Sequence, residues 1–139
     1  QRLAGEMGKD ISVIFSEETT GHPNTAKIVL ETVGGRTLEV VGVCVGGGNI
    51  EVRRINGMDV SFSCDYPTIL IFHNDRPGVI SRVTSMLAWQ NINIAFMKVF
   101  RNSKWEQAVM VIETDEPVAP ELLENIKRGI PDITEVCSL

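Results

Sequence analysis

The sequence predicts an α+β fold in two parts, a β-rich N-terminal half and a C-terminal half that combines strands with two helices. Short runs of β-branched and apolar residues, separated by Gly and Asn turns, fill residues 10–63. A short polar hinge follows them. Beyond this hinge, residues 79–90 and 120–128 carry apolar side chains at helical spacing. We therefore expect two domains, residues 1–64 and 65–139.

In the N-terminal half, apolar and polar residues alternate over short stretches, which is typical of strands. The segment 25–32 alternates most clearly and predicts a half-buried strand. Asn56-Gly57 is one of the strongest hairpin turn signals, and Gly46 to Gly48 marks another bend. The expected strands are residues 11–15, 25–32, 38–45, 50–55 and 58–62, after the tail of a helix at 2–9 that covers one face.

The C-terminal half follows the order strand, helix, strand, strand, helix, strand. Pro120 suits the first turn of the second helix, and Leu122, Leu123 and Ile126 lie on its expected buried face. This βαββαβ order is the ferredoxin-like arrangement. The elements are strands at 68–72, 92–100, 106–113 and 132–137, and helices at 79–90 and 120–128.

Composition and charge exclude several function classes. The net charge of -5 and the isoelectric point near 5.0 argue against a nucleic-acid partner, because no basic stripe could displace counterions from phosphates. No apolar run approaches the roughly 20 residues of a membrane helix. Cys44, Cys64 and Cys137 are odd in number and widely spaced, which favours reduced thiols in the cytoplasm and argues against a zinc or iron-sulfur ligand set.

The most informative stretch is His73-Asn74-Asp75-Arg76-Pro77-Gly78-Val79, which joins the first strand of the C-terminal half to its first helix. A tight turn at a helix start leaves backbone N–H groups unpaired. The helix start also concentrates partial positive charge, so the N–H groups of Val79 and Ile80 can receive a small carboxylate. We therefore expect an amino-acid site at this turn.

This stretch, together with Asn91-Ile92-Asn93-Ile94-Ala95, resembles the two signature stretches of the ACT domain, a regulatory module that binds amino acids. The resemblance extends from Tyr66 to Leu139. The N-terminal half resembles the allosteric substrate-binding domain of some phosphoglycerate dehydrogenases and of bacterial iron-sulfur L-serine dehydratases. Within it, Gly21-His22-Pro23-Asn24-Thr25-Ala26 and Gly46-Gly47-Gly48-Asn49-Ile50 are most similar to the beta chains of two-chain L-serine dehydratases.

The resemblance to these beta chains implies an enzyme, an L-serine ammonia-lyase of gluconeogenic metabolism, that converts L-serine to pyruvate and ammonia. It implies a 4Fe-4S cluster whose cysteine ligands belong to a partner alpha chain, so that this chain binds no cofactor and is inactive alone. These beta chains also begin with a segment upstream of the matched region, including a Ser-His stretch. We therefore expect the 1–64 domain to be incomplete at its N-terminus.

In related serine-binding ACT domains, three positions hold the ligand, and they correspond here to His73, Asp75 and Asn93, beside the backbone of Gly78. In a βαββαβ fold the first two strands run parallel, so the turn after the first and the start of the second lie at opposite ends of the sheet. Six-residue strands separate these ends by about 20 Å. One ligand can touch both only if two copies of the domain form a homodimer.

Several alternatives remain open from the sequence. Asp75 either attracts the ligand ammonium or caps the helix, and His73 taken alone would be a surface turn residue. The loop residues His22 and Asn24 either form a rigid turn or contact a partner chain or an anion. The Gly46 to Gly48 stretch lacks the Lys-Ser/Thr of a phosphate-binding loop. Besides a regulatory beta chain, the sequence fits the regulatory tail of a phosphoglycerate dehydrogenase or a free-standing amino-acid sensor.

Overall fold

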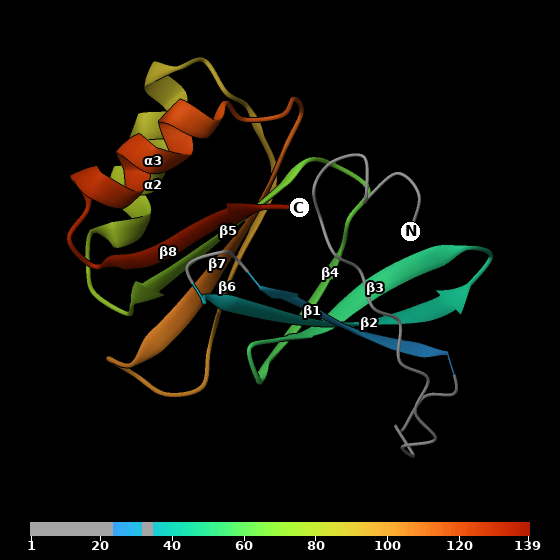
Figure 1. Ribbon diagram of the computed structural model, residues 1–139. Coiled ribbons are helices and arrows are strands. Elements are labelled where there is room, and N and C mark those ends of the chain that lie inside the picture. Colours follow the sequence, from blue (N-terminus) through green and yellow to red (C-terminus); the bar gives the residue numbers. More distant parts are fainter. Residues whose placement is uncertain (1–23, 32–34) are drawn as a thin grey trace.

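The computed structural model describes residues 24–31 and 35–139, which form two four-stranded sheets and two helices (Figure 1). The first sheet is an antiparallel meander in chain order. Its strands are β1 (Thr25–Glu31), β2 (Thr37–Gly46), β3 (Asn49–Ile55) and β4 (Met58–Ser63). The second sheet has the order β6-β7-β5-β8. Its strands and helices are β5 (Thr68–Asn74), α2 (Val79–Trp89), β6 (Ile94–Arg101), β7 (Gln107–Thr114), α3 (Pro120–Gly129) and β8 (Ile133–Ser138).

The expected α+β fold and the βαββαβ order of the C-terminal half are confirmed. The expected strand at 11–15 and the helix tail at 2–9 lie outside the described residues. The two sheets are joined by the short segment 64–67. The assignment of two separate domains meeting at residue 64 stays a prediction.

Both expected turns of the N-terminal half are present. Asn56 and Gly57 take φ values of 47° and 79° between β3 and β4, the left-handed pair that a two-residue hairpin needs. The run Gly46 to Gly48 forms the bend between β2 and β3, as expected, with a register irregularity beside it. These two turns fix the order of the first sheet.

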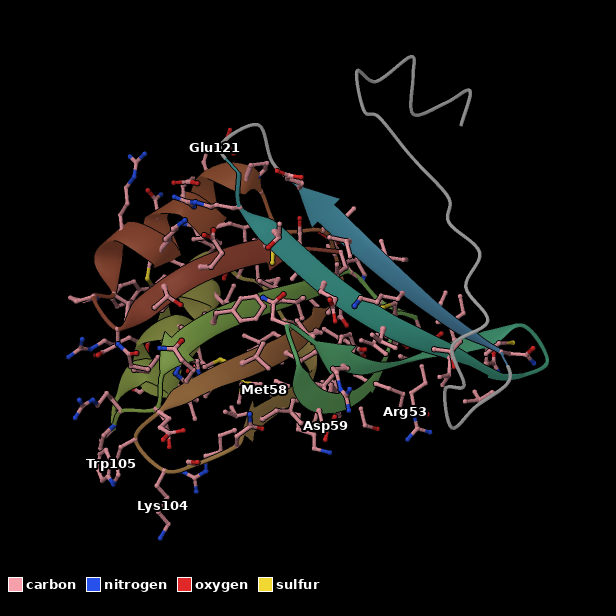
Figure 2. All side chains as sticks on the ribbon, turned by 60° about the horizontal axis from the view of Figure 1, so that its bottom comes forward. Arg53, Met58, Asp59, Lys104, Trp105 and Glu121 are labelled. Carbon is pink, nitrogen blue, oxygen red and sulfur yellow. The ribbon has the colours of Figure 1, made fainter. Side chains whose placement is uncertain are left out.

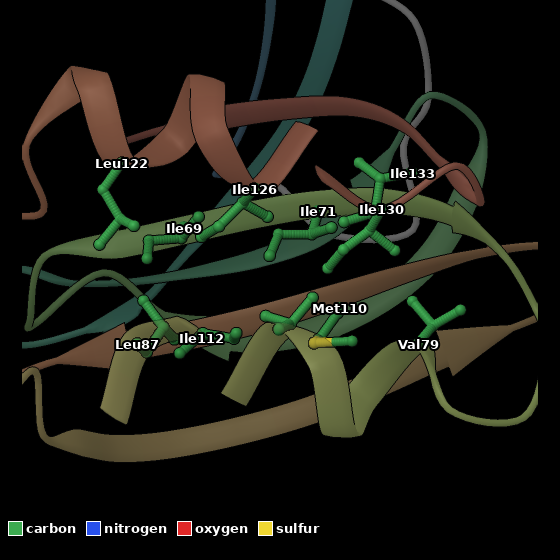
Figure 3. Packing of buried hydrophobic residues seen from close by; sticks show 11 residues of the cluster. Ile69, Ile71, Val79, Leu87, Met110, Ile112, Leu122, Ile126, Ile130 and Ile133 are labelled. Atoms are coloured by element: carbon green, nitrogen blue, oxygen red, sulfur yellow. The ribbon is translucent and has the colours of Figure 1, made fainter. Parts of the chain in front are cut away.

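One face of the second sheet is covered by α2 and α3 (Figures 1 and 3). Alternate side chains of β5 and β7 meet apolar side chains of both helices, and Figure 3 shows this layer from close by. The fully or almost fully buried members of this layer are Ile69, Ile71, Val79, Val83, Leu87, Met110, Ile112, Ile126 and Ile130. Pro120 begins α3 as expected, and Leu122 and Ile126 are buried while Leu123 is only partly so.

The opposite face of the second sheet packs against the first sheet. Leu70, Val109 and Val111 form one buried cluster with side chains of β2, β3 and β4. The partners from the first sheet are Val40, Val52, Ile55, Val60 and Phe62. Strands β5 and β7 are therefore apolar on both faces, which explains why their sequences are nearly continuous hydrophobic runs without alternation.

The expectation that residues 25–32 form a half-buried strand is correct for the strand and wrong for the burial. Ile28, Val29 and Leu30 are 52%, 56% and 51% exposed. β1 is the edge strand of its sheet and pairs only with β2. None of its residues belongs to the cluster between the sheets, so alternation predicted the strand correctly but could not show that the covering layer stops at β2.

Among the described residues, no helix is long and apolar enough to cross a membrane.

We expect Leu70→Ala to destabilise the protein by about 2–5 kcal/mol, because this fully buried side chain packs between the two sheets and its removal leaves a cavity. Leu30→Ala is the matched control, since Leu30 is half exposed on β1; its effect should stay within about 0.5 kcal/mol. Urea unfolding of both variants measures the difference. Equal losses would show that the sheets do not share a core.

Candidate functional site

His73 is a buried residue at the end of β5. Only 1% of it is exposed, so the alternative of a surface turn residue is wrong. Alternation along β5 places it on the same face as Ile69 and Ile71, the face covered by the helices. It pairs in register with Ala108 of β7 and Ile133 of β8. Its imidazole therefore lies inside the protein, close to the strand end.

The hydrogen bonds of His73 leave one ring nitrogen unused. Nδ1 lies 2.9 Å from the Asn74 carbonyl oxygen, which can only accept, so Nδ1 carries a proton and donates. In the neutral ring Nε2 is then an acceptor. It is buried and has no hydrogen-bond partner among the described residues. A buried acceptor without a donor is costly, so this atom suits a donor supplied from outside the chain.

Asp75 forms an ion pair and does not cap the helix. Its Oδ2 accepts hydrogen bonds from Arg101 Nη1 at 2.6 Å and from the Trp105 N–H at 3.4 Å. The cap position of α2 is Gly78, and no side chain caps that end. The capping alternative for Asp75 is therefore wrong. The hydrogen bond from Arg101 lowers the pKa of the Asp75 carboxyl, so the group is ionised at neutral pH.

The start of α2 is open. Gly78 has a φ of 90°, a left-handed conformation that glycine adopts without strain, and no atom lies within 4 Å of the place where a Cβ would stand. The Val79 N–H makes only a long hydrogen bond of 3.4 Å to the Arg76 carbonyl oxygen. Ile80 is 42% exposed. Of the two expected carboxylate receptors, Ile80 lies at the surface beside the open space at Gly78, whereas Val79 is only 1% exposed. The helix start therefore offers an anion the Ile80 end of this pair.

The loop between β6 and β7 forms the outer wall of this site. Figure 2 shows Lys104 and Trp105 projecting outward at the edge of the molecule. The guanidinium of Arg76 lies 5.9 Å from the centre of the Trp105 ring, and the Asp75 N–H donates to the Glu106 carbonyl at 2.7 Å. The sequence analysis missed Arg101 and Trp105, because they follow Asp75 by 26 and 30 residues and only the fold brings them to it.

Asn93 lies at the other end of the same sheet. Its Nδ2 donates to Asp115 Oδ2 at 2.7 Å. A carboxylate oxygen accepts, so the amide nitrogen faces Asp115 and the side-chain oxygen Oδ1 of Asn93 is left for another donor. The backbone carbonyl oxygen of Asn93 accepts the Asp115 N–H at 3.4 Å. The residue itself is exposed. Asn93 therefore presents a fixed acceptor to the solvent.

The register of the sheet separates the two motif stretches. His73 and Arg101 both pair with Ala108 on β7, whereas Ile94 pairs with Thr114 at the far end of that strand. The six residue steps from 108 to 114 correspond to about 20 Å. The sequence-based geometry is confirmed, because β5 and β6 are both antiparallel to β7 and so run parallel to each other. No single small ligand can touch His73 and Asn93 of one chain.

The second candidate site, in the N-terminal half, is only partly described. His22 lies outside the described residues. Asn24 is exposed immediately before β1, and its carbonyl oxygen accepts the Cys44 N–H at 2.9 Å. This bond extends the pairing of β1 with β2 by one residue, and the rigid-turn alternative for Asn24 stays a prediction. A contact of its side chain with a partner stays a prediction.

The cysteines do not fit an iron-sulfur cluster. Cys44 lies on β2, Cys64 follows β4 and Cys137 lies on β8, and the described residues hold no group of three metal-ligating side chains. Burial raises the pKa of the Cys137 thiol to about 11. Burial, followed by the charges of two nearby carboxylates, also raises the pKa of the Cys64 thiol. Cluster ligands are thiolates, so these environments oppose that role. The placement of a cluster on a partner chain stays a prediction.

Comparisons with known proteins agree with the fold and with the resemblance expected from the sequence. Residues 67–128 match the ACT domain family. The chain is similar to the probable L-serine dehydratase beta chain of Bacillus subtilis, with 35% identity over 138 residues, which cover 99% of this chain and 62% of the relative. It is also similar to the L-serine dehydratase beta chain of Peptoniphilus asaccharolyticus, with 33% identity over 92% of this chain and 56% of the relative.

A second group of relatives is named D-3-phosphoglycerate dehydrogenase. The protein of this name from Methanocaldococcus jannaschii is 36% identical over 87% of this chain and 22% of the relative. The chain thus spans about three fifths of the beta chains that it matches and about a fifth of this dehydrogenase.

We expect Arg101→Gln to raise the pKa of Asp75 toward its ordinary value, because the Arg101 hydrogen bond is the main cause of the lowering. A lowered carboxyl pKa stabilises the fold above the unfolded-state pKa and loses this effect as the pH falls. The variant should therefore lose less stability than the native chain between about pH 5 and pH 2.

NMR titration of the Asp75 carboxyl carbon measures this pKa. Lys98→Gln is the matched control: it removes a positive charge from the same strand, where Lys98 lies over the Phe100 ring and not beside Asp75. An unchanged Asp75 pKa in Arg101→Gln would contradict the ion pair.

Proposed function

We propose, from the match of residues 67–128 to the ACT domain family, that the chain is the regulatory beta chain of an L-serine dehydratase whose ACT domain binds L-serine or a related small amino acid. The similarity to two L-serine dehydratase beta chains over more than nine tenths of this chain supports the assignment to this enzyme. The observation that carries the binding role is the buried, unpartnered Nε2 of His73.

The polar groups of the site match the chemistry of L-serine. Three acceptors are available: Nε2 of His73, the second carboxylate oxygen of Asp75 and, from another copy, the amide oxygen of Asn93. L-Serine carries donors in its ammonium and its hydroxyl. Its carboxylate suits the open start of α2 beside Gly78, where Val79 and Ile80 present the positive end of the helix dipole.

Two copies of the ACT domain form the complete site in this proposal. His73 and Asp75 lie about 20 Å from Asn93 along the sheet. A twofold axis can bring the His73 end of each sheet next to the Asn93 end of its partner. Such a dimer contains two identical sites. Ligand binding then favours the homodimer by linkage.

The catalytic machinery of the proposed enzyme resides on an alpha chain. Conversion of L-serine to pyruvate and ammonia needs a Lewis acid that helps the hydroxyl group to leave. In the proposed holoenzyme, a 4Fe-4S cluster on the alpha chain would supply this Lewis acid. In this proposal the present chain supplies the binding groups for the amino acid and the alpha chain supplies the cluster ligands. The cytoplasmic location expected from the sequence stays a prediction.

Two alternatives differ in what this chain is attached to. The phosphoglycerate dehydrogenase relatives fit a regulatory tail of such an enzyme, since they match this chain over most of its length. The beta-chain relatives share a larger part of their own length with this chain, which favours the main proposal. A free-standing sensor would purify without an alpha chain that carries an iron-sulfur cluster.

We expect Asn93→Ala to weaken L-serine binding by about 1–3 kcal/mol, because a ligand donor loses its acceptor. The variant should also lose the effect of L-serine on the monomer-dimer equilibrium. Titration calorimetry and sedimentation with and without L-serine measure both quantities. Tight binding by a monomer, or unchanged affinity in the variant, would contradict a shared site.

We also expect the purified chain to form no pyruvate from L-serine, and to support pyruvate formation after an alpha chain with its cluster is added. A coupled assay for pyruvate, with the alpha chain alone as the control, measures this. Pyruvate formation by this chain without a partner would contradict the assignment as a regulatory chain.

A further inference from the structure

A cavity of about 430 Å³ lies between the two sheets at the end of the molecule away from His73. It is formed where the β3–β4 hairpin and the segment after it approach β6 and β7. Its polar lining includes Glu51, Asp65 and Glu113, and its apolar lining includes Phe62 and Phe96. It lies away from His73 and Asp75, on the face of β7 opposite to the helices, and at the same end of the sheet as Asn93.

Glu113 lines this open cavity and is only 6% exposed. It continues the row of Val109 and Val111 on the face of β7 that packs against the first sheet. Its Oε1 is buried and has no hydrogen-bond partner among the described residues. The alternation along β7 would predict an apolar side chain at position 113, after Val109 and Val111 on the same face, but a carboxylate stands there. Such a group is costly unless something outside the chain pairs with it.

Of the three carboxylates that line the cavity, Glu51 has an ion-pair partner, whereas Asp65 and Glu113 have none among the described residues. Glu51 is already satisfied, because Ser61 donates to Oε1 at 2.6 Å and Arg53 lies 2.7 Å from Oε2. Asp65 is exposed, and within the described part of the chain no ion pair reaches it or Glu113. Burial first and the charge of Asp65 second raise the pKa of Glu113. A bound cation would relieve both effects.

The shape of the lining selects an organic cation. A metal ion is a poor fit, because no three Asp, Glu, His or Cys side chains among the described residues lie close enough together to hold one. The apolar side chains Val45, Ile50, Phe62 and Phe96 suit an aliphatic stem. Phe96 is 40% exposed as a residue, and an aromatic ring can face a positive charge. The volume is within the range of small-ligand sites.

We propose that this cavity binds a primary ammonium group on an aliphatic stem, with Glu113 as its buried anionic partner and Asp65 at the rim. The negative lining repels carboxylates, so the ligand is a simple amine or a lysine side chain and not a free amino acid. Its ligand belongs to a different chemical class from that of the proposed L-serine site.

The test uses the full chain and two probes, n-butylammonium and Nα-acetyl-lysine methylamide, with n-butanol as the uncharged control. We expect saturable NMR shifts at the amides of Phe96 and Glu113 with at least one ammonium probe and none with n-butanol. Binding of the lysine derivative would identify a lysine side chain as a source of the ligand, whereas binding of n-butylammonium alone would identify a free amine.

Glu113→Gln should weaken the probe at least about tenfold, because it removes the charge while keeping the side-chain volume. Glu116→Gln removes an exposed carboxylate from the following loop and should leave the affinity unchanged. Asp65→Asn provides a second variant at an exposed position, with a smaller loss expected. Absence of shifts with both ammonium probes, or equal affinity in Glu113→Gln and the native chain, would overturn the proposal.

The affinity should also fall as the pH is lowered through the titration of Glu113, because a protonated carboxyl no longer pairs with the cation. The other titratable or charged groups near the cavity are Glu51, Arg53, Cys64 and Asp65. Repeating the titration on Asp65→Asn separates their effects: the pH dependence should persist there and disappear in Glu113→Gln. A pH dependence that survives in Glu113→Gln would contradict Glu113 as the partner.

Discussion

The position of β7 between β5 and β6 is the constraint on which the candidate site depends. Both neighbours are antiparallel to β7, so they are parallel to each other and their functional ends point in opposite directions. The turn that contains Asp75 and the start of β6 at Asn93 cannot meet within one chain. The proposed ligand site is thus incomplete in a single copy, and dimerisation is part of binding in this account. The same central strand places Glu113 on the opposite face, away from the helices.

Two buried polar atoms stand out because they have no hydrogen-bond partner, unlike the buried hydroxyls of Thr68 and Thr114. Within the described residues, Nε2 of His73 and Oε1 of Glu113 are the buried side-chain atoms without partners. They lie on opposite faces and near opposite ends of the second sheet. An unpaired buried group costs stability, and a bound ligand can return part of that cost as affinity. Nε2 of His73 can accept a hydrogen bond from a neutral or cationic donor, whereas the carboxylate of Glu113 pairs best with a cation. The two sites should therefore select different molecules.

The sequence predicted most of the elements because their signals are local. Asn56-Gly57 specifies its hairpin through backbone conformation alone, and the apolar spacing from Val79 onward specifies α2. Burial was less predictable because it depends on which layer covers which strand. β1 has the alternation of a half-buried strand but extends beyond the covering cluster, and His73 is buried although its turn is polar.

The contacts of the site were the least predictable part. The ion pair between Asp75 and Arg101 joins residues 26 positions apart in the sequence. It forms because β5 and β6 lie on either side of β7 in the sheet, which no local sequence pattern shows. The separation of the two motif stretches could nevertheless be derived in advance, because strand direction in a βαββαβ order follows from topology. Glu113 carried a weak signal, a lone acidic residue in line with Val109 and Val111 on one face of a strand.

The shared site is tested most directly by mixing two variant chains, one with Asp75→Ala and one with Asn93→Ala. Each variant dimer lacks a group in both of its sites. A mixed dimer contains one site that combines the native Asp75 of one copy with the native Asn93 of the other. Our account predicts that calorimetry shows weak L-serine binding for each variant alone and near-native affinity at about half the sites of the mixed dimers. Binding that stays weak after exchange of the chains is demonstrated would contradict a site built from two copies.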